Sequence, residues 1–181
     1  MAFRDGQRWD DRYSRRGPAP ADAVGPPAVF APHVDHFPSA GTALDVACGQ
    51  GFATVWLALR GMEAWGLDVS SVAIGHAAAV ARSRNVAPRC RFDVADLDGG
   101  LPPGPPVDVL LCHLFRDRRL DRQFVDRLAP GGLLAVAALS EVGAQPGPYR
   151  AGRGELAAAF ADLDVIAGGE ADGTAWLLAR R

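Results

Sequence analysis

A carboxylate and two closely spaced glycines stand together near residue 45. Asp45 ends an apolar run, and Gly49 and Gly51 follow it in the sequence DVACGQG. Small residues let a backbone approach a ligand, and a helix that begins after such a turn directs its N-terminus at that ligand. The stretch from Thr42 to Gly61 therefore predicts a strand, a glycine turn and a helix that bind a nucleotide. An ordinary tight turn between a strand and a helix gives the same pattern.

Two more acids follow predicted strands. Asp68 comes directly after the strand predicted for residues 63–67, where a carboxylate can accept hydrogen bonds from two ribose hydroxyls. It could instead cap the next helix, as could the serines at positions 70 and 71. Asp96 follows the third predicted strand, where it can accept from an exocyclic amine while the Leu97 amide donates to a purine ring nitrogen.

A histidine ends the fourth predicted strand. His113 follows the apolar run 107–112, and an imidazole there suits a general base at neutral pH. It could equally form a polar pocket wall with no part in proton transfer. His33 and His36 could approach the same place, whereas His76 is predicted on a helix surface.

These residues depend on elements that alternate along the chain. The predicted strands cover residues 43–46, 63–67, 90–94, 107–112, 133–139, 163–167 and 174–179. The predicted helices cover residues 28–36, 52–60, 71–83, 116–129 and 155–160. Alternation of this kind predicts an α/β fold with a mostly parallel sheet, and Asp172-Gly173 predicts a closing hairpin. The alternating Arg and Asp residues of helix 116–129 predict a solvated face.

Length and composition predict one domain over residues 1–181. The chain is 49% hydrophobic and 22% charged, and its net charge of −2 gives no basic surface for nucleic acid. All 19 basic residues are arginine, which excludes a lysine Schiff base and a P-loop lysine. Three cysteines without paired spacing predict neither disulfides nor a zinc site. No apolar run is long enough to cross a membrane and no signal peptide is visible, so we expect a cytoplasmic protein without membrane partners.

The N-terminal region differs from the rest. Trp9 and Tyr13 are four residues apart and share one face if residues 1–16 form a helix. A run rich in proline and glycine then separates them from the core. We expect residues 1–36 to form a helical lid over the core of residues 42–181, or simply a docked terminal helix.

Five segments in order resemble the class I S-adenosylmethionine (SAM)-dependent methyltransferases. They are LDVACGQG, WGLDVS, DVADLD, VDVLLCHLF and LAPGGLLAV. The first matches the family's motif I, with Ala47 where the family usually has glycine. The WDDRY, HLFR and GPYRAGRGEL segments are most similar to the small tellurite-resistance and thiopurine-methyltransferase-like group. The resemblance covers nearly the whole chain and implies a Rossmann-like sheet of seven strands, the last antiparallel, with helices on both faces.

The resemblance also implies a cofactor and its contacts. SAM would bind and leave as S-adenosylhomocysteine (SAH). Asp45 would hold the methionyl amino group, Asp68 the ribose, and Asp96 the adenine amino group. The other implied contacts are Trp9, Tyr13, Ala47, Cys48, Gly49, Gly51, Val69, Leu97, Cys112 and His113.

The expected reaction is methyl transfer to a small molecule through a thiol, a chalcogen oxyanion or a hydroxyl, with His113 as the catalytic base if one is needed. The expected protein is a monomer or homodimer that binds no metal. Three alternatives remain: a SAM-binding protein without activity, a nicotinamide-dependent oxidoreductase, and a methyltransferase for proteins or nucleic acids. Thr54 at the third position of a dinucleotide motif argues against the oxidoreductase.

Overall fold

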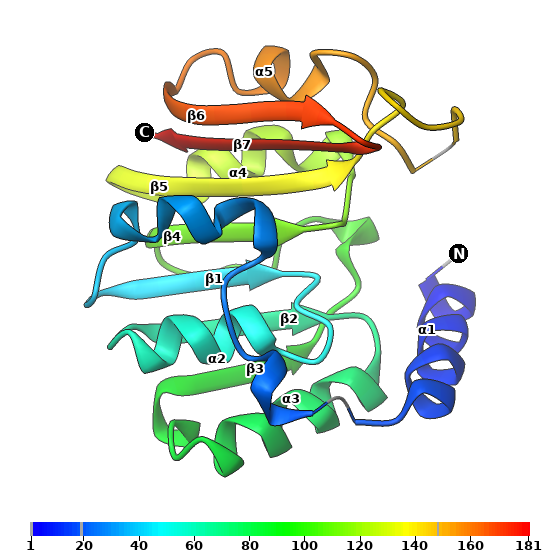
Figure 1. Ribbon diagram of the computed structural model, residues 1–181. Coiled ribbons are helices and arrows are strands. Elements are labelled where there is room, and N and C mark those ends of the chain that lie inside the picture. The colour runs from blue at the N-terminus through cyan, green and yellow to red at the C-terminus, as the bar shows by residue number, and fades with distance from the viewer. Residues whose placement is uncertain (1, 19, 148) are drawn as a thin grey trace.

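A computed structural model of the chain describes residues 2–18, 20–147 and 149–181; Met1, Ala19 and Pro148, which fall in the predicted lid and in the GPYRAGRGEL loop, lie outside the described residues. One sheet runs through the molecule with helices on both faces (Figure 1). Its strands are β1 Thr42–Val46, β2 Glu63–Asp68, β3 Cys90–Val94, β4 Val107–His113, β5 Leu128–Leu139, β6 Asp164–Ala171 and β7 Thr174–Arg180. The α-helices are α1 Ala2–Arg16, α2 Phe52–Leu59, α3 Ser71–Ser83, α4 Asp121–Arg127 and α5 Glu155–Ala159. Short 3₁₀ helices are η1 Ala21–Ala23, η2 Ala28–His36, η3 Ala87–Arg89, η4 Leu97–Gly99 and η5 Arg118–Leu120.

The strand order confirms the predicted fold class. The seven strands lie in the order β3-β2-β1-β4-β5-β7-β6, and β7 runs antiparallel to both of its neighbours. The chain moves outward from β1 to β3 and then crosses back to β4, which pairs with β1 in parallel. Ligands of open α/β sheets bind at the carboxyl end of the strands where the order reverses, which here lies between β1 and β4.

Buried apolar side chains on both faces hold the central strands in place. On one face, β1, β4 and β5 pack against α2 and η2, with Phe30 and Leu57 fully buried. On the other face they pack against α4 and α5, with Phe124 and Phe160 buried. The Leu110 and Leu111 side chains point to opposite faces and both are fully buried, as expected for a strand covered on both sides. Packing on both faces therefore fixes the positions of the carboxyl ends of β1 and β4.

The predicted bounds of three elements are wrong. Strand β5 begins at Leu128 rather than 133, because Leu128 is fully buried and pairs with Val107 before a bulge. The preceding helix, predicted for 116–129, is reduced to η5 and α4. Strand β6 continues to Ala171 rather than 167, through Gly168 and Gly169. A methyl group on Gly169 would lie 2.7 Å from the Trp176 indole nitrogen, so glycine makes room for the indole.

Helix α1 lies apart from the sheet, across its carboxyl edge and beside α3 (Figure 1). The chain then returns through η1 and η2 to the face that carries α2. The first 36 residues thus reach the predicted ligand edge twice, once with α1 and once with the segment around Pro27.

Candidate active site

The glycine turn after β1 uses left-handed backbone at three positions. Ala47, Gly49 and Gly51 have φ angles of 57°, 54° and 75°. Gly51 packs tightly, since a methyl group there would lie 2.6 Å from the Ala77 Cβ of α3. The backbone of the turn therefore has a conformation that favours glycine. Ala47 adopts the same conformation, although it is unfavourable for a residue with a Cβ atom.

Asp68 fastens this turn to the end of β2. The Gly49 N–H donates to Asp68 Oδ2 at 2.8 Å, and the Ser70 N–H donates to Asp68 Oδ1 at 2.9 Å. The N-cap of α3 is Ser70, whose hydroxyl accepts from the Ala73 N–H, so Asp68 is not the cap. Burial raises the pKa of Asp68. Each carboxylate oxygen accepts one backbone bond and keeps capacity for another.

Asp45 lies beneath the turn and is almost completely buried. Thr54, in the first turn of α2, donates its hydroxyl to Asp45 Oδ2 at 2.6 Å. Burial raises the pKa of Asp45 to about 7, although the Thr54 bond opposes this shift. The sequence contained one signal for this partnership that was not recognised, a polar residue within the otherwise apolar segment 52–59.

Helix α1 lies on the glycine turn. The Trp9 and Tyr13 rings are 5.8 Å apart, and a methyl group on Gly49 would lie 2.8 Å from the Tyr13 hydroxyl. Burial raises the pKa of Tyr13 to about 12, with the Asp68 charge adding to the shift. Gly6 packs against Val69, since a methyl group there would lie 3.5 Å from the Val69 carbonyl oxygen.

Asp10 fixes α1 to the start of α3. Its carboxylate accepts from the Ser70 hydroxyl at 2.6 Å, the Ser71 hydroxyl at 3.2 Å and the Val72 N–H at 3.1 Å. These bonds, the Ser70 bond first, lower the pKa of Asp10. A carboxylate at a helix N-terminus also interacts favourably with the helix dipole. Sequence reasoning noticed the aromatic residues of WDDRY but missed this acid.

Gln50, in the glycine turn, connects the end of α1 to α3. Its amide donates to the Gly17 carbonyl at 2.8 Å and lies 2.9 Å from His76 Nδ1. His76, predicted on a helix surface, is half-buried and has this partner.

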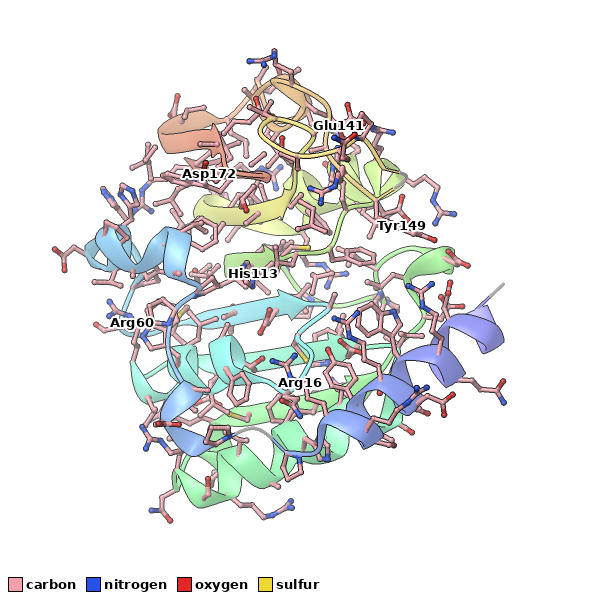
Figure 2. The ribbon with its side chains drawn as sticks, turned by 45° about the vertical axis from the view of Figure 1, so that its right-hand side comes forward. Arg16, Arg60, His113, Glu141, Tyr149 and Asp172 are labelled. Carbon is pink, nitrogen blue, oxygen red and sulfur yellow. The ribbon has the colours of Figure 1, made fainter. Side chains whose placement is uncertain are left out.

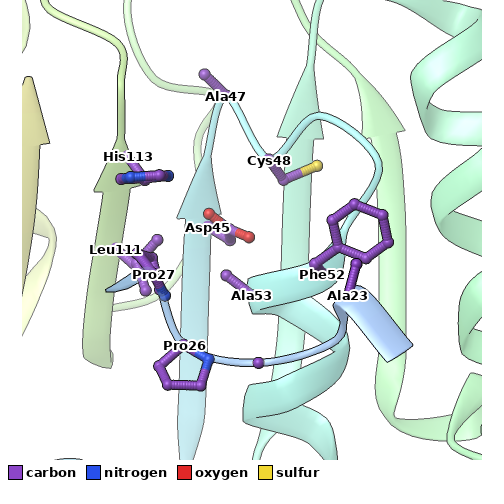
Figure 3. A pocket seen from close by; sticks show the side chains of 11 residues that line it. Ala23, Pro26, Pro27, Asp45, Ala47, Cys48, Phe52, Ala53, Leu111 and His113 are labelled. Atoms are coloured by element: carbon purple, nitrogen blue, oxygen red, sulfur yellow. The ribbon is translucent and has the colours of Figure 1, made fainter. Parts of the chain in front are cut away.

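A cavity of about 230 Å³ opens beside the turn (Figure 3). His113 and Leu111 line it from β4, Asp45 from β1, and Phe52 from α2. The remaining lining residues are Ala23, Gly25, Pro26, Pro27, Ala47, Cys48 and Ala53. In Figure 3 the His113 ring lies across the cavity from Cys48, with Asp45 between them. Burial lowers the pKa of His113, so its imidazole is neutral at pH 7.

Of the predicted site residues, four line the cavity: Asp45, Ala47, Cys48 and His113. Six others lie at the glycine turn and its contacts with β2 and α1: Trp9, Tyr13, Gly49, Gly51, Asp68 and Val69. Cys112 is fully buried in the core on the opposite face of β4 from His113, and its thiol donates to the Phe115 carbonyl at 3.6 Å. Asp96 and Leu97 lie at the end of β3, where the exposed Asp96 carboxylate accepts from the Asp98 N–H. His33 stacks on Trp176 at 5.2 Å and His36 is exposed, and neither lines the cavity.

The predicted solvated helix face carries a partly buried ion-pair network. Arg116 follows β4, has a side chain only 6% exposed, and binds Asp121 at 2.5 Å and Glu155 at 2.8 Å. Arg118 binds the same glutamate, which lowers the pKa of Glu155 to about 2. The network joins the β4 end to α4 and α5.

Two further features bear on function. Within residues 2–18, 20–147 and 149–181, no group of three His, Cys, Asp or Glu side chains could hold a metal ion. No helix in the described part of the chain is both long and apolar enough to cross a membrane.

Comparison with known proteins identifies a methyltransferase domain. A family model described as "Methyltransferase domain" matches residues 43–132, about half of the chain. A search of curated proteins finds no significant match.

Solved structures share the fold. TehB from Haemophilus influenzae has a TM-score of 0.76 at 17% identity, covering 96% of this chain and 67% of that one. Geranyl diphosphate C-methyltransferase from Streptomyces coelicolor A3(2), in complex with Mg²⁺, geranyl diphosphate and SAH, has a TM-score of 0.71 at 16% identity, covering 99% and 96%. A structure described as "Conversion of a Disulfide Bond into a Thioacetal Group during Echinomycin Biosynthesis" has a TM-score of 0.69 at 23% identity, covering 97% and 92%.

Proposed function

Because the chain belongs to the class I SAM-dependent methyltransferases, we propose that it transfers a methyl group from SAM to a small molecule held beside His113. The observation that carries this proposal is the bond from the Gly49 N–H to Asp68, which joins the glycine turn to the acid of β2 next to the cavity. This is the place where an adenosyl group needs both a close backbone approach and a carboxylate.

The residues at the sheet edge fit this cofactor. Asp68 has acceptor capacity left for ribose hydroxyls, and Asp45 lines the cavity where an amino group would find a carboxylate. Trp9 and Tyr13 on α1 would cover the bound molecule, with Cys48 and Gly51 in the turn beneath it. Val69 and Leu97 would lie beside the adenine, and Asp96 would accept from its amino group. The buried Cys112 thiol is left out of this proposal, since it points into the core.

When bound, SAM supplies a methyl group that its positively charged sulfur already activates, and SAH remains after transfer. The protein needs to hold the acceptor in line and exclude water. His113 lines the cavity with a neutral imidazole, so it can take the proton that a thiol or hydroxyl acceptor loses. The prolines at positions 26 and 27 close the cavity on the side away from the sheet (Figure 3).

Calorimetric titration with SAH and, separately, NADH tests this function. We expect SAH to bind and to raise the melting temperature, because a ligand selective for the folded state stabilises it. Asp68→Asn keeps the shape of the side chain but loses its charge, so SAH should bind about tenfold more weakly. Asp164→Asn, an exposed acid at the start of β6, should bind SAH like wild type. Binding of NADH without a response to SAH would contradict the proposal.

A further inference from the structure

Large apolar side chains are exposed at the carboxyl ends of β4 and β5. Leu114 directly follows β4 and is 51% exposed, Leu139 ends β5 and is 39% exposed, and Tyr149 in the following loop is 67% exposed. In Figure 2, Tyr149 lies to the right of His113, which is near the centre of the view. None of the three residues lines the cavity, so a ligand that contacts them would extend from the cavity to this edge of the sheet.

Leu114 is held in an unfavourable backbone conformation. Its φ angle is 59°, and its N–H donates to the Ala137 carbonyl at 2.8 Å, which fixes the peptide at the end of the β4–β5 ladder. A left-handed conformation is rare and unfavourable for a bulky side chain. Leu114 is half exposed, so packing in the core does not explain why a leucine occupies this unfavourable position. Strain of this kind concentrates at functional sites.

Leu139 lies on the same face of the sheet as His113. His113 is opposite Ala137 in the β4–β5 register, and side chains two residues apart on a strand share a face. On the neighbouring strand β5, Leu139 therefore lies two residues beyond the position opposite His113, toward the carboxyl end of the strand. Leu114 adjoins His113 in the chain. Leu114 and Leu139 are thus neighbours of His113 in the chain and in the strand register, and both lie outside the lining of the cavity.

The charges around the cavity do not suit an anion. Its lining contains no arginine and one buried acid, Asp45. The arginines after β4 are engaged: Arg116 and Arg118 bind Glu155, and Arg119 binds Asp117 and Asp98. Arg150, in the loop after β5, donates to the Ser140 carbonyl. An oxyanion inside the cavity would lie beside the Asp45 carboxyl group with no arginine in the lining to compensate its charge, which is costly.

We propose that the acceptor is an uncharged molecule with an apolar body, that Leu114 and Leu139 hold this body, and that its thiol or hydroxyl faces His113. This inference rests on the proposed function and narrows its acceptor class, leaving out chalcogen oxyanions. Methylation removes one proton from such an acceptor and adds one methyl group, and His113 takes the proton. Leu114 is then a specificity-determining residue.

Binding to the SAH-saturated protein tests the proposal, with 2-naphthol and benzyl mercaptan as apolar probes and sodium selenite as the anionic probe. We expect both apolar probes to bind at least tenfold more tightly than selenite. When SAM is supplied in place of SAH, the protein should methylate both probes and form SAH. Leu114→Ala should weaken their binding about tenfold, since a leucine side chain loses its contact with the ligand. SAH affinity should be unchanged.

Two further variants separate acceptor binding from folding. Leu59→Ala removes a similarly exposed leucine (46%) from the end of α2, and we expect probe binding like wild type. Leu114→Gly relieves the backbone strain, so it should weaken probe binding without lowering the melting temperature. The proposal is overturned if selenite binds as well as the apolar probes, if neither apolar probe binds, or if Leu114→Ala binds them like wild type. Failure of wild type to bind SAH would overturn the proposed function instead.

Discussion

Ala47 carries a side chain at a backbone position that favours glycine. Its φ angle of 57° places the Cβ near the following carbonyl. Ala47 is one of the residues that line the cavity, but its methyl group points away from Asp45 (Figure 3). In motif I of the class I SAM-dependent methyltransferases, glycine usually occupies this position. Ala47 therefore makes the folded state less stable than glycine would at this position.

Ala47→Gly should raise the free energy of unfolding by about 0.5–1 kcal/mol, because relief of the left-handed strain exceeds the added entropy of the unfolded chain. Urea unfolding at pH 7 measures the change. Ala53→Gly is the matched control, since Ala53 also lines the cavity but lies inside α2. A glycine in a helix costs about 1 kcal/mol, so the control should shift in the opposite direction. A loss of stability in both variants would show that Ala47 is unstrained.

At the scale of elements, the position of α1 depends on one carboxylate. Asp10 accepts three hydrogen bonds from the start of α3, whereas its neighbour Asp11 is exposed and only approaches Arg15 at 4.0 Å. The lid remains a prediction: we expect the proline and glycine residues between positions 17 and 27 to let α1 move as a unit.

Asp10→Ala should speed hydrogen exchange of the α1 amides about 10- to 100-fold, since loss of charge-assisted bonds favours an open α1. Asp11→Ala should exchange like wild type. SAH should slow α1 exchange in wild type and in the control, because it would bind between α1 and the glycine turn. Exchange in Asp10→Ala at the wild-type rate, with or without SAH, would mean that other contacts hold α1.

Most elements could be predicted from periodicity, and the errors have local causes. Strands β1 and β4 could be predicted because buried parallel strands give continuous apolar runs. The edge strand β3 has instead an alternating sequence, CRFDV, and no fully buried residue. The early start of β5 was missed because Pro130 and two glycines indicate a turn, while Leu128 gains full burial by pairing with Val107. The length of β6 was missed because Gly168 and Gly169 disfavour a strand except where a neighbouring indole needs the space.

For the site, the sequence identified groups on strand ends but not the contacts between elements. The positions of Asp45, Asp68 and His113 follow from parallel strands ending at one edge. The hydrogen bonds of Asp10 to the start of α3 join residues about 60 positions apart, which no local pattern encodes. In the sequence, Thr54 indicates only that the third glycine of a dinucleotide motif is absent. In the structure, its hydroxyl is the hydrogen-bond partner of Asp45.

At the scale of the whole molecule, two buried groups near the cavity make opposite contributions to the pH dependence of stability. Burial raises the pKa of Asp45 from 3.8 to about 7, so the folded chain binds more protons between these values. The contribution of Asp45 is fully present below pH 3.8 and is lost as the pH rises through about 7. Burial lowers the pKa of His113 from 6.5, so the unfolded chain binds more protons just below pH 6.5 and stability from this group rises with pH there.

Asp45→Asn keeps an acceptor for the Thr54 hydroxyl and removes the acid, so it should become more stable relative to wild type as the pH rises. Each pKa unit corresponds to 1.36 kcal/mol, so the difference in unfolding free energy should change by about 2–3 kcal/mol between pH 5 and 8. Urea unfolding at intervals across this range measures it, with Asp35→Asn, an exposed acid on η2, as the control. His113→Asn should change the slope in the opposite sense below pH 6.5. Parallel curves for Asp45→Asn and wild type would mean that Asp45 is ionised in the folded protein at pH 5, and its carboxylate would then be available to an amino group throughout this pH range.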